Sequence, residues 1–488
     1  MHQTTSHSEV IIIGAGMSGI CMGIKLLKAN ITDFMILEKA SDVSGTWFYN
    51  NYPGSGCDIP SALYNYSFYL NPNWSKKYSL QEEIKDYFKE CVVNFNLSNH
   101  IRLSSELLSA KFDEKLNLWN LTLANQQQMT CRFLISGLGQ LNAPYQPEFK
   151  GSERFRGVTF HSSQWNHKVD VTNKNVCVIG NAASALQFIP HLVSRAKTVN
   201  VLQRSPNYVI PRNDRLYSEF EKKCFKLFPL FQRIHRFWIY LRQEMFYGVI
   251  VNNKWSQKTL TNEFKRYISD HIKDNNLLEK LTPTYPIGCK RILVSDNYYQ
   301  SISQPNVRIE VEPISEFSDL GIVTQSGKQI LADIVIYATG FKTNEFLYPV
   351  KFYGKNNIPL NEVWINGAES YRGVCVKHFP NFFILYGPNT NLGSNSIIFM
   401  VEQQVKYVIK CIKKLKQKKF SRIEIREHIF DSYNKNIQLD MQKTVWIESC
   451  NSWYKNKDGK VVNNWPNSPT SYYFHMKFPN YSHFLMCN

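Results

Sequence analysis

The chain has 488 residues, which is too long for one ordinary hydrophobic core and predicts two or three domains. Hydrophobic residues make up 43% and charged residues 20% of the sequence, as is usual for a globular protein. The formal net charge is +18, but no helix-turn-helix, zinc-finger, RRM or KH signature accompanies it, so we expect no nucleic-acid partner.

Cysteine and histidine spacing excludes the common metal sites. The 11 cysteines include no C-x-x-C pair and the 12 histidines do not cluster, so we expect no metal. Scattered cysteines are typical of a reducing compartment, and the apolar residues 10–20 lack the basic flank of a signal peptide. The aromatic stretch 225–251 is interrupted by charges and is no membrane span. We therefore expect a cytoplasmic protein without an integral membrane segment.

The first predicted unit is a strand, a glycine-rich turn and a helix. Residues 9–13 are a β-branched run typical of a buried parallel strand, residues 20–29 are helix-like, and a second strand spans 34–37. The turn between strand and helix reads G-x-G-x-x-G, which lets a pyrophosphate approach the helix N-terminus, and an acid after the second strand accepts hydrogen bonds from ribose hydroxyls. This pattern predicts an FAD site formed by Gly14, Gly16, Gly19 and Glu38.

The same pattern returns with two changes. Strands are predicted at 175–179 and 199–202, and the turn between strand and helix contains Gly180, Ala182, Ser184 and Ala185. Arg204 follows the second strand in place of an acid, which suits the 2′-phosphate of NADPH. Ala182 replaces the second glycine, and its methyl group is either absorbed by a small backbone shift or weakens NADPH binding. A turn that binds no nucleotide is the remaining alternative.

A long helical region interrupts the second unit. Helical periodicity, including residues 217–245, runs between Pro206 and Pro286. We expect this insertion to shape a substrate pocket and to bury its apolar face. Docking of its aromatic and basic residues to a membrane surface is the alternative.

These elements predict an α/β fold with two Rossmann-like dinucleotide-binding domains and a helical insertion in the second. We expect the FAD-binding domain to begin with residues 1–145. The NADPH-binding domain is expected at 146–330, with its insertion at about 212–285. Residues 331–488 then complete the FAD-binding domain and add a C-terminal segment.

Two longer strings resemble the fingerprints of the Baeyer–Villiger monooxygenases, the class B flavin-dependent enzymes that include cyclohexanone and 4-hydroxyacetophenone monooxygenases. Residues 155–166 are similar to F-x-G-x-x-x-H-x-x-x-W-[P/D], with Asn166 in place of Pro or Asp. Residues 44–58, which contain Gly45-Thr46-Trp47 and end at Asp58, resemble the second long motif, with Ser44 at its first small position. Because residues 288–299 and 333–341 also match, the resemblance covers nearly the whole chain.

The resemblance implies a reaction and a set of site residues. NADPH would reduce FAD, dioxygen would add to give a C4a-peroxyflavin, and one oxygen would be inserted next to a ketone carbonyl. It implies that Arg291 stabilises the peroxide and that Asp58 positions Arg291. The further residues implied for FAD are Thr46, Trp47, Asp58 and Tyr64, and those implied for NADPH, beside Arg204, are Ser205, Lys290 and Trp453.

Two other functions stay open at this point. An N- or S-oxygenating flavin monooxygenase shares the cofactors, and the departures from the family pattern at Asn166 and Ala182 keep it open. Ser394, where related chains often carry His, is a smaller departure. A flavoprotein that only oxidises NADPH is the second alternative, which Ala182 favours. The expected partners are O₂ and a small ketone or heteroatom substrate, whose identity the sequence does not reveal.

Overall fold

The computed structural model describes residues 6–448, 450 and 452–488. Its largest sheet has eight strands in the order β17-β4-β5-β6-β1-β2-β3, with β18 also paired to β6. The central strands are parallel and buried on both faces, as continuous apolar runs require. The strands are β1 (Ser6–Ile13), β2 (Phe34–Leu37), β3 (Ile101–Arg102), β4 (Leu107–Asp113), β5 (Leu118–Leu123), β6 (Gln128–Ser136), β17 (Lys351–Tyr353) and β18 (Phe382–Ile384).

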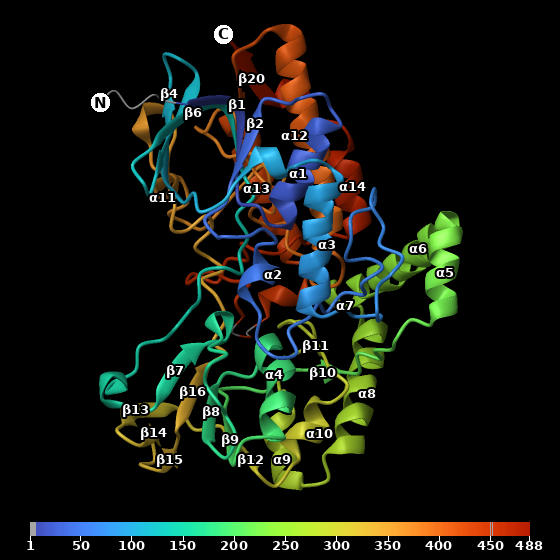
Figure 1. Ribbon diagram of the computed structural model, residues 1–488, viewed down its shortest axis with the longest axis vertical. Helices are drawn as coiled ribbons and strands as arrows, with labels where there is room; N and C mark the ends of the chain where they lie inside the picture. The colour runs from blue at the N-terminus through green and yellow to red at the C-terminus, as the bar shows by residue number, and fades with distance from the viewer. Residues whose placement is uncertain (1–5, 449, 451) are drawn as a thin grey trace.

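Helices from both ends of the chain cover this sheet. Helix α1 packs against α12, and α12 packs against α14, so the C-terminal segment completes the same core as the N-terminal strand. Figure 1 shows these elements together in the upper body of the molecule. The helices are α1 (Met17–Leu27), α2 (Thr46–Tyr49), α3 (Gln81–Asn94), α11 (Leu360–Val363), α12 (Ile397–Lys418), α13 (Glu427–Met441) and α14 (Pro469–Lys477), and a ribbon of β19 (Arg422–Ile425) and β20 (Phe484–Cys487) lies beside them.

The second sheet is parallel throughout, in the order β12-β9-β8-β16-β7. Its strands are β7 (Val158–His161), β8 (Asn175–Ile179), β9 (Thr198–Leu202), β12 (Val307–Glu310) and β16 (Ile334–Tyr337), flanked by α4 (Ala183–Val193) and α10 (Tyr298–Ile302). A small sheet of β13 (Ile314–Ser318), β14 (Gly321–Thr324) and β15 (Gln329–Leu331) extends this lower body. The two sheets confirm the predicted α/β fold with two Rossmann-like units.

One boundary lies later than the sequence suggested. Strand β16 is fully buried between β7 and β8, so it belongs to the second sheet and not to the segment after residue 330. We therefore place the return to the first sheet after Tyr337. The backbone there runs beside the outgoing connection, with the Tyr145 N–H donating to the carbonyl of Gly340 at 2.8 Å and the Lys342 N–H to that of Ala143 at 2.9 Å.

The insertion is helical, as expected, and its apolar side chains are buried in its second half but exposed in its first half. It contains α5 (Glu219–Leu227), α6 (Pro229–Met245), α7 (Tyr247–Ile250), α8 (Lys254–His271) and α9 (Asn275–Leu281), preceded by β10 (Val209–Ile210), which pairs with β11 (Leu293–Val294). Helices α5 and α6 project from the side of the molecule in Figure 1, and their large apolar side chains are exposed. The expectation of a buried face therefore holds for α7, α8 and α9, whose apolar residues join the second core. It is wrong for α5 and α6, because polar residues of α6 face the protein instead. None of the described helices combines the length and the apolar character that crossing a membrane requires.

Candidate active site

A cavity of about 900 Å³ is lined by both glycine-rich turns, and this volume suits bound cofactors and a small substrate. All of the predicted site residues line it except Gly19 and Ala185, which are buried behind the turns. Among the described residues, none between 212 and 285 lines this cavity. The expectation that the insertion shapes the pocket is therefore wrong for this cavity, because α5 and α6 project away from the body.

The first turn is built so that side chains would obstruct it. Gly14 has a φ of +95° and Gly45 a φ of +54°, conformations that other residues rarely adopt. A Cβ added to Gly45 would lie 2.9 Å from Cα of Gly16, and one added to Gly19 would lie 1.9 Å from the carbonyl oxygen of Gly14. The turn therefore packs directly on helix α1, whose N-terminus has no side-chain cap and opens toward the cavity.

Glu38 ends the second strand of this unit beside the turn. Its side chain accepts hydrogen bonds from the N–H groups of Ala15, at 2.7 Å, and Ala40, at 2.9 Å. These bonds fix the carboxylate in the cavity wall while leaving it further capacity to accept.

Thr46, Trp47 and Tyr64 form the wall next to this turn. The indole N–H of Trp47 donates to the hydroxyl of Tyr64 at 3.2 Å, and the two rings meet edge to face at 5.7 Å. Burial raises the pKa of Tyr64 well above its usual value, so its hydroxyl stays protonated. The wall is therefore aromatic and uncharged at this point.

The second turn repeats the first with alanine in place of glycine. Gly180 has a φ of +107° and lies too close to the Ala338 carbonyl for any side chain, with a Cβ contact of 2.4 Å. Ala182 precedes helix α4 with φ and ψ of −87° and −163°, close to the −78° and −172° of Gly16 before α1. Since both residues adopt the same extended conformation, the methyl group of Ala182 introduces no backbone strain.

Two cations lie beside the second turn. Lys290 donates to the hydroxyl of Ser205 at 2.7 Å, and its ammonium lies 4.6 Å from the centre of the Tyr285 ring. Burial and the nearby charge of Arg204 lower the pKa of Lys290. Arg204 is exposed in the same cavity wall, so the two side chains form a positive site that favours a bound anion.

Arg291 and Asp58 meet across the cavity from different parts of the chain. The Nη2 atom of Arg291 donates to Oδ2 of Asp58 at 2.9 Å, and the two side chains are 40% and 14% exposed. Burial lowers the pKa of Arg291, but the Asp58 carboxylate raises it, with a net rise. The guanidinium is thus fixed at one end and open to the cavity at the other.

Gln187 on helix α4 holds the loop that carries Asp58, and no sequence motif indicated this role. Its Oε1 accepts from the Tyr52 hydroxyl at 2.9 Å and from the Gly56 N–H at 3.3 Å. Its Nε2 donates to the Gly56 carbonyl at 3.0 Å and to Oδ1 of Asp58 at 3.4 Å. Gly54 lets the loop approach this closely, because a Cβ there would lie 2.5 Å from the Gln187 carbonyl.

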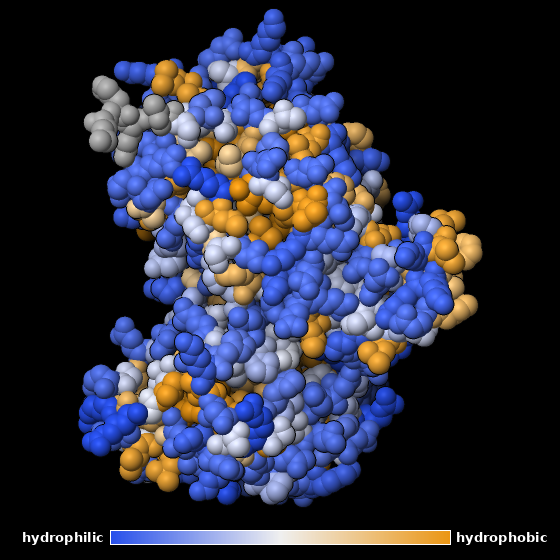
Figure 2. Space-filling view, in the orientation of Figure 1, coloured by the Kyte–Doolittle hydropathy of each residue, from blue (hydrophilic) through white to orange (hydrophobic). Residues whose placement is uncertain are grey.

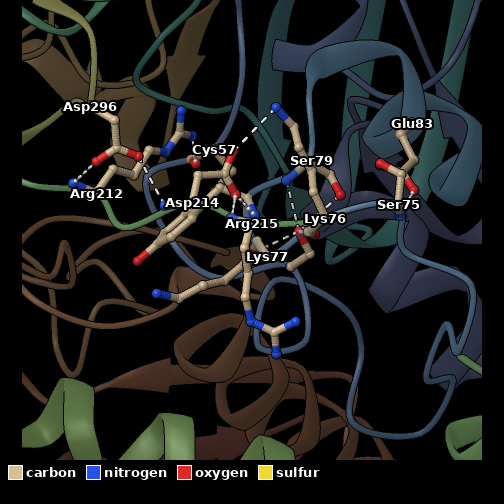
Figure 3. Close-up of polar contacts among 12 residues, drawn as sticks. Cys57, Ser75, Lys76, Lys77, Ser79, Glu83, Arg212, Asp214, Arg215 and Asp296 are labelled. Carbon is tan, nitrogen blue, oxygen red and sulfur yellow. Dashed lines mark hydrogen bonds and ion pairs between the residues drawn. The ribbon is translucent and has the colours of Figure 1, made fainter. Parts of the chain in front are cut away.

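A second polar network anchors the start of the insertion to the first unit (Figure 3). Asp296 accepts from the backbone N–H groups of Arg212, at 2.8 Å, and Asp214, at 2.9 Å. Asp214 in turn pairs with Lys76 at 3.3 Å, and the guanidinium of Arg212 donates to the carbonyl of Cys57. Both Cys57 and its neighbour Asp58 are therefore held by residues of the second unit.

His161, from the first fingerprint, lies beside Phe341, in the segment that leads from the second sheet back to the first. Its ring is 1% exposed, contacts Phe341 edge to face, and accepts from the Ser163 N–H at 3.1 Å. Burial lowers its pKa to about 4, so the ring is neutral at neutral pH. Trp165 instead packs between Phe160 and Phe188 in the second core.

A covalent link joins the second unit to the C-terminal segment close to this cavity. Cys289, directly before Lys290, forms a disulfide with Cys450, with the Cα atoms 6.2 Å apart. Trp453, three residues beyond Cys450, lines the cavity, and its carbonyl accepts from the Asn463 side chain at 3.0 Å. The bond was not indicated by the sequence, which favoured a reducing compartment.

Comparisons with known proteins agree with this arrangement. The family described as pyridine nucleotide-disulphide oxidoreductase matches residues 11–218. A Baeyer–Villiger monooxygenase of Pseudomonas aeruginosa is 37% identical over 465 residues, covering 94% of this chain and 88% of that protein. The crystal structure of OTEMO in complex with FAD and NADP is 27% identical, with a TM-score of 0.88, covering 99% of this chain and all of the other.

The same fold recurs at lower identity. Cyclohexanone monooxygenase from Rhodococcus sp. Phi1, bound to NADP⁺, has a TM-score of 0.90 over 99% of this chain at 23% identity, which shows the fold alone. The identity to the Pseudomonas enzyme, in contrast, extends over nearly the full length of both proteins. With its two dinucleotide folds and its fingerprint residues, the chain belongs to the Baeyer–Villiger monooxygenases.

Proposed function

We propose that this enzyme uses FAD, NADPH and O₂ to insert one oxygen atom next to the carbonyl of a ketone, giving an ester or lactone. The observation that carries the proposal is the Arg291–Asp58 pair in the wall of a cavity that also contains both glycine-rich turns. The location in the cytoplasm is part of the proposal; free cysteines such as Cys21 and Cys131 support it, whereas the Cys289–Cys450 disulfide argues against it.

The first turn fits FAD. The uncapped N-terminus of α1 offers backbone N–H groups to a pyrophosphate, and Gly14, Gly16 and Gly45 leave the space that Cβ atoms would fill. Glu38 has remaining acceptor capacity for ribose hydroxyls. Thr46, Trp47, Tyr64 and Asp58 would border the flavin end of the molecule.

The second turn fits NADPH. Helix α4 also begins without a side-chain cap, next to Gly180, Ala182 and Ser184. Arg204 and Lys290 would bind the 2′-phosphate, with Ser205 hydrogen-bonded to the lysine. Ala182 has the same backbone conformation as Gly16, so the turn keeps its shape with alanine in place of glycine.

Arg291 would act on the charge that develops during oxygen transfer. When bound, FAD supplies the electrons that activate O₂. Arg291 keeps its positive charge at any working pH, and Asp58 holds it in one orientation, so it can stabilise a negatively charged oxygen without rearranging. Lys at this position would be a poorer substitute, since only the planar guanidinium reaches Asp58 and keeps further donors free.

The direct test replaces Arg291 with alanine. We expect conversion of a ketone to fall to background while NADPH still bleaches the flavin absorbance, with the consumed O₂ released as hydrogen peroxide. Arg308→Ala, an exposed arginine outside the cavity, is the matched control and should behave as wild type. Ketone conversion by Arg291→Ala at the wild-type rate would refute the role of Arg291, and a thioether oxidised in preference to any ketone would establish the heteroatom alternative.

The nucleotide assignment has its own test. Arg204→Ala should raise KM for NADPH by roughly ten- to hundred-fold, the value of a charged hydrogen bond, and leave KM for NADH nearly unchanged. Equal effects on the two nucleotides would show that Arg204 does not contact a 2′-phosphate.

A further inference from the structure

Helices α5 and α6 present a continuous apolar surface to solvent. Trp238 is 65% exposed, Met245 72% and Phe220 76%. Figure 2 shows orange side chains gathered at the right-hand edge, where α5 and α6 project in Figure 1. We call this surface the hairpin face; its members are Phe220, Leu227, Phe228, Leu230, Phe231, Ile234, Phe237, Trp238, Leu241 and Met245.

The spacing of these residues makes α6 an amphipathic helix turned outward. Leu230, Ile234, Phe237, Leu241 and Met245 recur every three or four residues, so they form a stripe spanning about 80° of the helix circumference. A helix on a protein surface normally turns such a stripe toward the core. Here the stripe faces water. Single exposed apolar residues are common on protein surfaces, but a contiguous group of this size indicates an interaction site.

The inner face of α6 is polar and well bonded, so the orientation of the helix is fixed. Arg236 donates to the carbonyls of Ala62 and Leu63, each at 3.0 Å, and to Oδ1 of Asn65 at 2.6 Å. Gln232 donates to the carbonyl of Asn71 at 2.7 Å. Turning the apolar stripe inward would break these bonds and leave a buried guanidinium without partners.

Charge decides what covers the hairpin face. Arg233 and Arg242 lie on the two borders of the stripe, and Lys223 and Lys226 extend from α5. Within the described part of the chain, none of these four cations takes part in an ion pair. The nearby acids are already paired or hydrogen-bonded: Glu219 with Lys222, Glu221 with Arg215, and Glu244 with the Thr470 N–H.

A second copy of the chain would bring these cations against one another, since a two-fold contact places the same patch on both sides. An anionic lipid surface has the complementary charge, and its headgroup region accepts both tryptophan and phenylalanine side chains. We propose that the hairpin face docks the enzyme on the surface of a membrane that contains anionic lipids. The stripe enters the headgroup region, and the four cations contact lipid phosphates.

Vesicle sedimentation of the full-length enzyme tests this proposal. We expect the protein to pellet with vesicles made of equal parts phosphatidylcholine and phosphatidylglycerol, far less with phosphatidylcholine alone, and progressively less as salt is raised. The variant Ile234→Ser/Phe237→Ser/Trp238→Ser should lose the binding. Lys226→Glu/Arg233→Glu should weaken the partition coefficient by at least about five-fold for each charge removed.

Matched controls separate docking from general stickiness. Leu116→Ser/Ile365→Ser removes two apolar side chains of similar exposure, 66% and 77%, outside the insertion, and Lys168→Glu/Lys197→Glu changes two exposed cations elsewhere. Both controls should pellet like wild type, and circular dichroism should show that every variant is folded.

Three outcomes would overturn the proposal. The first is no binding of wild type to the anionic vesicles, and the second is equal binding by the triple serine variant. The third is a dimer in sedimentation velocity that the triple variant converts to a monomer without any vesicle binding, which would identify a second copy as the occupant. None of these readouts uses enzymatic activity, so they are independent of the proposed reaction.

Discussion

Replacing Gln187 with leucine removes the side chain that ties helix α4 to the loop carrying Asp58. Leucine has a similar volume, so the change deletes hydrogen bonds and leaves the packing nearly intact. The Tyr52 hydroxyl, on a residue only 8% exposed, and the Gly56 carbonyl lose their partners at 2.9 and 3.0 Å, and two longer contacts disappear as well. At about 1 kcal/mol for each of the shorter bonds, plus the cost of leaving buried polar groups unpaired, the loss is about 3 kcal/mol.

Two measurements follow from this loss. For a chain of this length, the melting temperature of Gln187→Leu should fall by roughly 3 °C. The freed loop no longer holds Asp58 against Arg291, so the ester formed per NADPH consumed should fall by roughly ten-fold or more, while flavin reduction stays close to wild type. Gln300→Leu, on an exposed position of α10, is the matched control. If Gln187→Leu had the same melting temperature and the same yield of ester per NADPH as this control, Gln187 would not position the loop.

Three other changes test separate features. Burial lowers the pKa of His161 from 6.5 to about 4, so between these pH values the unfolded chain binds a proton that the folded protein does not. The free energy of unfolding should therefore fall by up to about 3 kcal/mol as the pH drops from 6.5 to 4. His161→Gln should make the melting temperature less dependent on pH in this range, and an unchanged dependence would contradict the assignment. Gly45→Ala should lose its flavin on gel filtration, since the added Cβ would collide with Gly16 in the first glycine-rich turn. A variant that stays yellow would argue against flavin binding at this turn. Before reduction, the denatured protein should titrate with two fewer thiols than the 11 cysteines, and a full count would exclude the Cys289–Cys450 bond.

Local patterns predicted the nucleotide folds well because their physics is local. A β-branched strand, a turn that requires positive φ at Gly14 or Gly180, and a helix starting without a cap all lie within a few neighbouring residues. The same locality explains why Glu38 and Arg204, each just after a strand, were found. Strand β16 was assigned to the wrong side of a boundary because a short apolar run does not say which sheet it joins.

Contacts between segments that are far apart in the sequence could not be predicted from such local patterns. Gln187 occupies an ordinary helical position, and its partners precede it by more than 100 residues. The disulfide spans a sequence separation of 161. Helical periodicity predicted the stripe of α6, but it does not say which side of a helix faces water. Here the bonds made by Arg236 decided the orientation.

The two connections between the sheets constrain how the molecule can open. They run side by side as a ribbon closed by the hydrogen bonds of Tyr145 with Gly340 and of Lys342 with Ala143. Such a ribbon can bend, but it resists shear because sliding would break both bonds. The Cys289–Cys450 disulfide and the Arg291–Asp58 ion pair join the two halves at further points, so the ribbon is one of several links that hold the cavity walls together. Inserting residues into one connection alone would shift the two segments of the ribbon out of register, whereas equal insertions in both connections would keep these hydrogen bonds in register.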